Sequence, residues 1–109
     1  MNIKTPREFF EKELPNKFDP TKTEGLDAVI QMSITGPNGG DWTIIVKDKK
    51  MEIKVGNHPS PAISVKIADT DFVNLINGKL NAISAFMSGK IGFKGSMSLG
   101  LKLIDMGVI

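Results

Sequence analysis

Alternating apolar and polar positions run through the first half of the chain. Residues 26–35 place apolar side chains at every second position and, except at Val29, polar ones between them, which predicts a strand with one wet face. Three similar runs follow at 42–46, 51–55 and 63–67, separated by segments rich in glycine, proline and charge. Four consecutive strands with short links predict an antiparallel meander.

The amino-terminal segment has a helical pattern instead. Thr5 can cap a helix that starts with Pro6, and Glu8 completes a capping box. Phe10 and Leu14 then share one helix face, and Pro15 is expected to end the helix. Residues 16–25 read as a connecting loop.

Helical periodicity returns after the fourth run. Asp69 or Thr70 can cap a helix that ends at Asn77-Gly78, and a second helix is expected before Ser88-Gly89. A short strand over 91–94 and a last helix from Ser96 to about residue 107 complete the series. The sequence therefore predicts one α+β domain over residues 1–109, with five strands.

The last helix has apolar residues on two sides. One stripe contains Met97, Leu101, Ile104 and Val108, and a second contains Leu99, Leu103 and Met106. A helix that rests on a sheet needs one apolar face only. Two interpretations remain open: the helix is buried deeply or in a dimer interface, or it packs on the core with one side and on a ligand with the other.

Residues 85–97 combine glycine, lysine and bulky apolar side chains. Glycine recurs at Gly89, Gly92 and Gly95, a pattern that suits a phosphate loop, an RNA clamp or a tight helix–strand–helix passage. RNA-clamping glycine loops join two helices, whereas these glycines bracket a strand. The passage is favoured: Gly89 ends a helix, Gly92 allows close approach, and Gly95 turns the chain.

Composition and charge exclude several classes of function. The 109 residues include 14 basic and 12 acidic residues, which gives no basic footprint for nucleic acid, and there is no cysteine. His58 stands alone in a proline-marked loop, and Asp69 and Asp71 suit a helix start better than a catalytic pair. We therefore expect no catalytic residues, no metal and no cofactor. The charged start and the lack of a spanning apolar run predict a cytoplasmic protein.

A series of short motifs resembles the sterol carrier protein 2 (SCP2) family. The motifs are Asp69-Thr70-Asp71-Phe72, Asn77-Gly78-Lys79-Leu80-Asn81, Ala85-Phe86-Met87-Ser88-Gly89-Lys90-Ile91 and Lys94-Gly95-Ser96-Met97-Ser98-Leu99, together with Trp42-Thr43 after a glycine-rich hairpin. The likeness runs from about Phe9 to Met106. The chain departs from the family at Ala82, where proline is common, and at its end, which lacks the peroxisomal address tripeptide. A free-standing, prokaryotic, cytoplasmic form is expected.

The resemblance implies a mostly antiparallel five-stranded sheet with helices over one face and an apolar tunnel that includes the closing helix. Family members bind sterols, fatty acids, fatty acyl-CoA or phospholipids noncovalently, so a lipid-binding and lipid-transport domain without enzymatic activity is expected. The residues expected to line the tunnel are Ile30, Met32, Trp42, Phe72, Leu75, Phe86, Met87, Ile91, Phe93, Met97, Leu101 and Ile104.

Partners follow from this interpretation. We expect a lipid ligand and transient membrane contact, and no nucleic acid. Lys90 and Lys94 could meet an acidic headgroup at the tunnel mouth, although solvation of a strand edge is favoured. The alternative function is an accessory or dimeric interaction module that presents the apolar last helix to a second copy or to a lipid-handling enzyme.

Overall fold

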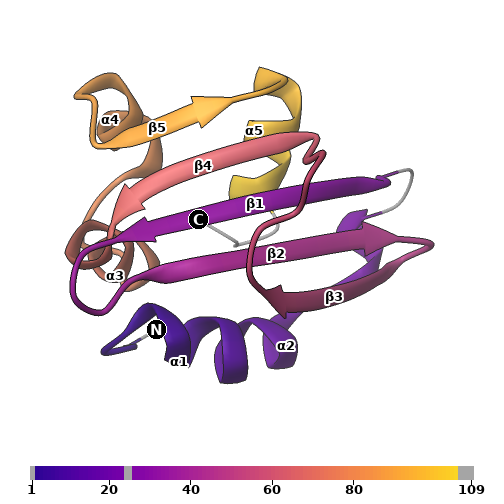
Figure 1. The fold of residues 1–109 in the computed structure, drawn as a ribbon, viewed down its shortest axis with the longest axis horizontal. Helices are drawn as coiled ribbons and strands as arrows, with labels where there is room; N and C mark the ends of the chain where they lie inside the picture. The colour runs from indigo at the N-terminus through magenta and orange to yellow at the C-terminus, as the bar shows by residue number, and fades with distance from the viewer. Residues whose placement is uncertain (1, 24–25, 106–109) are drawn as a thin grey trace.

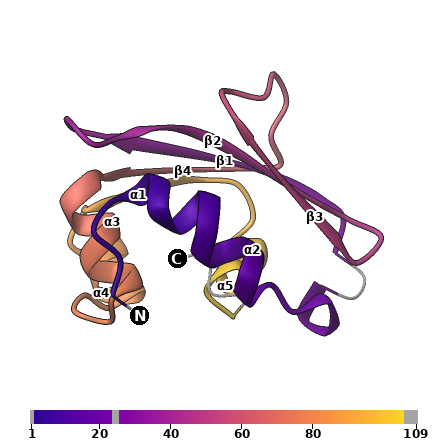
Figure 2. The ribbon, with the colours of Figure 1, turned by 90° about the horizontal axis from the view of Figure 1, so that it is seen from below.

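A five-stranded sheet forms the centre of the structure, a computed structural model that describes residues 2–23 and 26–105. The strands are β1 (Ala28–Thr35), β2 (Gly40–Lys47), β3 (Lys50–Val55), β4 (Ile63–Ala68) and β5 (Ile91–Lys94). The helical segments are α1 (Pro6–Glu8), a π-helical turn η1 (Phe9–Glu13), α2 (Leu14–Lys17), a 3₁₀ turn η2 (Pro20–Thr23), α3 (Asp69–Ile76), α4 (Ala82–Met87) and α5 (Met97–Asp105). Figures 1 and 2 show the labelled helices on one face of the sheet, which confirms the predicted α+β arrangement.

The strand order is β3-β2-β1-β4-β5, and the sheet is mixed. Met32 in β1 lies opposite Trp42 in antiparallel β2 and opposite Val65 in parallel β4, and Val65 in turn faces Phe93 in antiparallel β5. Three of the four strand pairs are antiparallel. The expectation of a mostly antiparallel sheet is confirmed.

The predicted meander of four strands is wrong at its last step. β4 pairs with β1 in parallel, because residues 56–62 carry the chain from the β3 edge across the outer face of the sheet (Figures 1 and 2). Gln31 on this face accepts a hydrogen bond from the His58 N–H at 2.8 Å, and its amide donates to the carbonyls of Trp42 and Gly56 at 3.3 and 3.4 Å. Gln31 is therefore buried beneath the crossing segment rather than wet.

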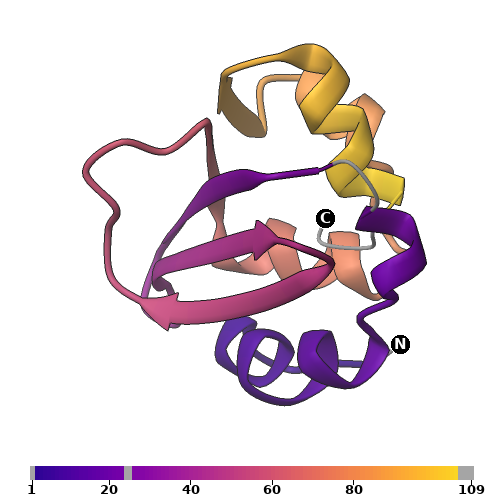
Figure 3. The same cartoon turned by 90° about the vertical axis from the view of Figure 1, so that its right-hand side faces the viewer.

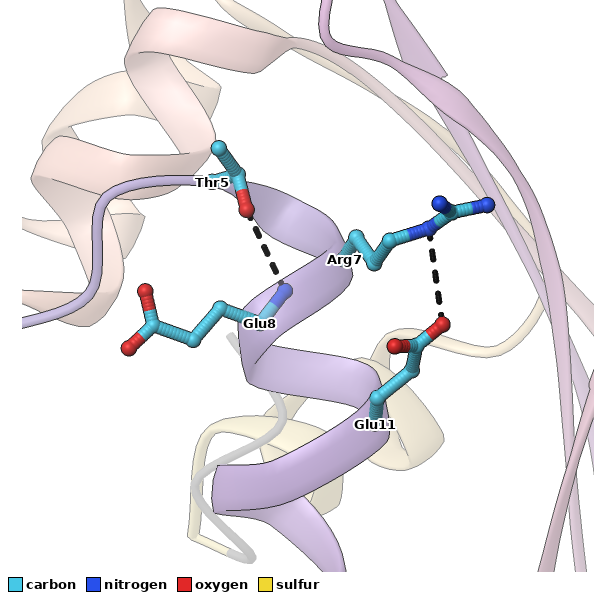
Figure 4. A network of polar contacts seen from close by, with 4 residues as sticks. All are labelled: Thr5, Arg7, Glu8 and Glu11. Atoms are coloured by element: carbon cyan, nitrogen blue, oxygen red, sulfur yellow. Dashed lines mark hydrogen bonds and ion pairs between the residues drawn. The ribbon is translucent and has the colours of Figure 1, made fainter.

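The amino-terminal helix begins at Pro6 with Thr5 as its cap, as predicted, but the Glu8 carboxylate bonds to the Lys4 N–H and not to the Thr5 N–H of a capping box. The Glu8 N–H donates to Thr5 Oγ1 at 3.3 Å (Figure 4), and Glu8 Oε1 accepts from the Lys4 N–H at 3.0 Å. The ion pair of Arg7 with Glu11, also drawn in Figure 4, is exposed and contributes little to stability.

Pro15 does not end this helix, contrary to expectation. It lies in the first turn of α2, directly after the π-helical turn η1, and the helix continues to Lys17. A proline disrupts a helix by removing a hydrogen bond to the carbonyl four residues back. The π turn changes that register locally, since Leu14 N–H bonds to Phe9 O, five residues back.

Aromatic side chains fix the amino-terminal helix to the sheet. The Phe10 ring stacks on Trp42 at 5.0 Å and on Phe72 at 5.4 Å between centroids, and Phe9 meets Phe10 and Phe72 edge to face. All four rings are buried in the core between the helix layer and the sheet. This cluster ties η1, α3 and β2 together.

The start of α3 is tied to the hairpin between β1 and β2. The buried Asp69 carboxylate accepts hydrogen bonds from the N–H groups of Asn38 at 2.9 Å and Thr70 at 2.8 Å. Two backbone donors are thereby satisfied by one side chain.

The amino-terminal helix and α5 stand at opposite ends of the helix layer (Figures 1 and 3).

Candidate functional site

The passage α4–β5–α5 forms a compact unit at one edge of the sheet. Asn81 caps α4 by accepting from the Ser84 N–H at 3.0 Å, and Ala85 is fully buried beneath the helix. Gly89 and Gly95 follow α4 and β5 with φ angles of 81° and 130°, values that side-chain-bearing residues rarely adopt. These two glycines therefore let the chain reverse twice within a few residues.

Gly92 was predicted to allow a close approach, and the neighbouring strand does not come unusually near it. A Cβ atom at Gly92 would lie 3.5 Å from Lys66 Cβ, which is an ordinary contact distance. The structure therefore gives no sign of a close approach at this position.

An apolar groove of about 230 Å³ lies between α4, β5 and α5. Its lining contains no charged residue and consists of Ala82, Ile83, Phe86, Met87, Ile91, Phe93, Met97, Gly100, Leu101 and Ile104. We call this set the α4–β5–α5 groove. It is open to solvent: Met87 is 79% exposed, and Met97 and Leu101 are 54% and 52% exposed.

Phe93 separates the groove from the core. Its ring meets Phe86 edge to face at a centroid distance of 6.1 Å. A Cβ atom at Gly100 would lie only 2.9 Å from the Phe93 ring, so the absence of a side chain there lets α5 rest directly on the ring. Gly100 thus sets the distance between α5 and β5.

The two apolar sides of α5 have different environments. Leu103 is fully buried and Leu99 partly buried against the core, whereas Met97, Leu101 and Ile104 line the groove. The described part of α5 therefore agrees with the second interpretation, in which the helix packs on the core with one side. Its other side faces the groove. The predicted stripe members Met106 and Val108 lie outside the described residues.

Seven of the twelve residues predicted to line the tunnel meet at this groove. They are Phe86, Met87, Ile91, Phe93, Met97, Leu101 and Ile104. The other five, Ile30, Met32, Trp42, Phe72 and Leu75, are buried in the core away from the groove. The described residues form an open groove, so a tunnel that joins all twelve stays a prediction.

Sequence reasoning omitted three lining residues. Ile83 precedes Met87 by four positions and therefore shares its face of α4, a signal that was available. Ala82 and Gly100 are small, and their role depends on neighbouring elements that periodicity does not reveal.

A larger hollow of about 430 Å³ lies between the amino-terminal helix and strands β2 and β3. Its lining includes the carboxylate-bearing Glu11 beside Phe10, Phe18, Met51 and Val55. Size alone would favour this hollow, but Glu11 places a carboxylate in its wall and its surface is more polar than that of the α4–β5–α5 groove. We take the α4–β5–α5 groove as the candidate site because its chemistry is uniform.

Other polar residues have structural explanations. The His58 ring nitrogen Nδ1 accepts from the Ser60 N–H at 3.0 Å, so the ring stabilises its own loop. Within residues 2–23 and 26–105, no three His, Asp or Glu side chains gather closely enough to hold a metal ion. In the same part of the chain, no helix is long and apolar enough to span a bilayer.

A mixed five-stranded sheet, helices on one face and an apolar groove under the edge strand define a class of small α+β domain. Residues 9–106 match the model of the SCP-2 sterol transfer family, and the chain belongs to that family. The family consists of lipid-binding and lipid-transfer domains. The predicted family and fold are confirmed.

Relatives of the chain include larger proteins as well as single domains of similar length. The bovine hydroxysteroid dehydrogenase-like protein 2 (Bos taurus) is 39% identical over 81 residues, which are 73% of this chain and 19% of that protein. The chain therefore spans about a fifth of the length of this curated relative. The palmitated SCP2L2 of Aedes aegypti has a TM-score of 0.72 at 24% identity and covers 95% of each chain. The sec-alkylsulfatase Pisa1 of Pseudomonas sp. has a TM-score of 0.78 at 22% identity, over 96% of this chain and 16% of the sulfatase.

Proposed function

We propose that this domain binds the apolar tail of a lipid noncovalently in the α4–β5–α5 groove and transfers it, without catalysis. The observation that carries the proposal is the lining itself, which is apolar throughout and open to solvent. Exposed apolar surface of this kind is costly in a soluble protein and marks interaction sites. Family membership and the palmitated state of the Aedes aegypti relative support a fatty acid, fatty acyl-CoA, sterol-like lipid or phospholipid as ligand.

The groove accommodates part of a long chain as it stands. Its volume of about 230 Å³ is below the range of about 300–1,000 Å³ typical of ligand pockets. A long tail would therefore extend beyond the groove unless α5 moved away from Phe93.

Tail length should set the affinity until the groove is filled. Each buried methylene contributes about 0.8 kcal/mol, which corresponds to about a fourfold change in Kd. The proposal is tested by titrating the delipidated protein with a series of fatty acids of increasing length, by displacement of a fluorescent fatty acid. We expect a fourfold gain per methylene that levels off at the length the groove accepts. The same low affinity at every length would refute the proposal.

Native mass spectrometry of protein purified without detergent gives an independent check. A discrete mass increase that extracts as lipid would support the carrier function and identify the ligand class. A ligand-free dimer whose formation depends on α5 would favour the interaction module instead.

A further inference from the structure

β5 is the outermost strand on its side of the sheet (Figure 1), and it pairs with β4 along one side of its backbone. Apart from residues of β4, no described residue hydrogen-bonds to the backbone of Ile91–Lys94. In an antiparallel strand every second residue directs its N–H and C=O groups away from the paired neighbour. These groups form the free side of β5, which can accept another strand.

The two faces of β5 differ in chemistry. Ile91 and Phe93 belong to the inner face, where they line the α4–β5–α5 groove. The alternation of the strand therefore puts Gly92 and Lys94, and by the same period Lys90, on the outer face. Apolar surface lies on one side of this sheet edge and positive charge on the other.

The outer face carries three lysines around Gly92. Lys66 in β4 lies opposite Gly92, and Lys90 and Lys94 stand two residues to either side of it. All three lysines are exposed, and none forms an ion pair within the part of the chain that the structure describes. Residues 72–104 contain no acidic residue, so this lysine cluster has no counter-charge on its own sheet edge.

The inner side of the same edge holds most of the exposed bulky apolar side chains. Five of the six such residues in the described part of the chain line the groove, namely Ile83, Phe86, Met87, Met97 and Leu101. The sixth, Val55, lies at the end of β3. Apolar exposure is therefore concentrated beside β5 rather than scattered over the surface.

The β3 edge of the sheet lacks this combination. There Lys54 and Glu52 pair with each other at 3.3 Å, so positive charge has an acidic neighbour on the same strand. Charged side chains on an edge strand deter unspecific pairing, and mixed charge does so for partners of either sign. The β5 edge bears positive charge alone, which deters a basic strand and favours an acidic one.

We propose that β5 docks an extended segment of a partner protein in which acidic and apolar residues alternate, paired to the free side of the strand. Successive side chains of an added strand point to opposite faces of the sheet. Its carboxylates therefore reach the lysine cluster while its apolar side chains cover the groove mouth. A second copy of β5 in the same place sets lysines beside lysines, which is unfavourable. The inference goes beyond the proposed function, because it uses the sheet edge and the rim of the groove rather than its interior.

The test is the binding of a short fluorescein-labelled peptide of alternating glutamate and valine, followed by fluorescence anisotropy. The wild-type protein should bind this peptide, and the bound peptide should protect β5 amides from hydrogen exchange. A peptide of the same composition with its glutamates and valines in separate blocks should bind much more weakly. The alternating peptide with every second backbone nitrogen methylated should also bind weakly, because it keeps its side chains but loses hydrogen-bond donors. Equal binding of all three peptides would overturn the proposal.

Matched protein variants test the lysine cluster. The double variant K90Q/K94Q should bind the alternating peptide more weakly, by up to about fivefold for each lysine. The variant K47Q/K50Q has the same change in net charge on the opposite side of the sheet and should bind like wild type. Equal weakening in both variants would show that only the overall charge matters, and would overturn the docking site.

The apolar face has its own matched pair. Met87→Gln should weaken peptide binding, whereas Val55→Gln, at a similarly exposed residue in β3, should not. A dimer in native mass spectrometry that Met87→Gln dissociates would assign the edge to a second copy and overturn the proposal. A wild-type protein that takes up fatty acid but ignores all three peptides would refute strand docking and leave lipid binding intact.

Discussion

The wall of the groove can be tested by the double variant Met97→Gln/Leu101→Gln. Both side chains are about half exposed in the free protein, at 54% and 52%, so a bound tail would cover the apolar area that remains. Full burial of a leucine or methionine is worth about 1.5–3 kcal/mol, and half of that is about 1 kcal/mol for each residue. The apolar term alone therefore predicts a loss of about 2 kcal/mol, or about a 30-fold rise in Kd.

The glutamine amides add to this loss. An amide pressed against a hydrocarbon tail loses hydrogen bonds to water without replacement, which costs about 1–3 kcal/mol in proteins. The measured rise in Kd for a fluorescent fatty acid should therefore exceed 30-fold. Folding stability should change little, because half-exposed side chains tolerate substitution and Leu103 still holds α5 to the core.

Two controls isolate the effect. The swap Met97→Leu/Leu101→Met conserves volume and apolar character, so it should bind within a few-fold of wild type. Val55→Gln places the same amide on an exposed apolar site away from the groove and should leave Kd unchanged. A folded Met97→Gln/Leu101→Gln protein with wild-type affinity, confirmed by urea denaturation, would show that these residues do not contact the ligand.

Three further predictions concern stability and the position of α5. Phe10→Ala removes the ring at the centre of the aromatic cluster and should cost about 3–5 kcal/mol in urea unfolding, whereas Phe10→Leu should cost clearly less. Asp69→Ala leaves two backbone N–H groups without their acceptors, Oδ2 for Asn38 and Oδ1 for Thr70, and should cost about 1–3 kcal/mol in urea unfolding. Asp69→Asn keeps only one of these acceptors and should also be destabilised, and an Asp69→Ala protein as stable as wild type would contradict the hydrogen-bond explanation. Gly100→Ala gains about 1 kcal/mol of helix propensity, but its Cβ atom crowds the Phe93 ring. We therefore expect a net loss of thermal stability and weaker fatty-acid binding. The control Ser98→Ala, at an exposed position of the same helix, should show neither effect.

Periodicity predicted the strands well but not all of their neighbours. The alternation over residues 26–35 and 63–67 correctly marked β1 and β4, because burial on one face requires a period of two. Alternation does not specify which strand lies alongside. The parallel β1–β4 pairing depends on the crossing of residues 56–62, which Gln31 holds by hydrogen bonds to its backbone. In the sequence, Gln31 is only one more polar residue on a strand.

Part of the groove lining could be predicted because it comes from elements that follow one another in the sequence. α4, β5 and α5 are consecutive, so the residues they bring together could be inferred from local signals such as Gly89 and Gly95. The five core residues assigned to the same site could not be separated from it, because a ligand wall and a protein core require the same apolar side chains. Met32 and Met97 are the same residue type, yet one is fully buried and the other half exposed.

An open groove requires α5 to pack loosely on the groove side, whereas a stable fold requires it to pack tightly. Leu103 anchors the helix in the core, while Gly100 leaves a contact with Phe93 that no side chain interlocks. A better-filled groove would expose less apolar surface, but it would also leave less space for a tail. A bound lipid instead covers the exposed apolar surface itself, so it should stabilise the fold by about 2.7 kcal/mol at a hundredfold excess over Kd. On the proposed function, the apolar area exposed in the free protein would be the source of its affinity for a lipid.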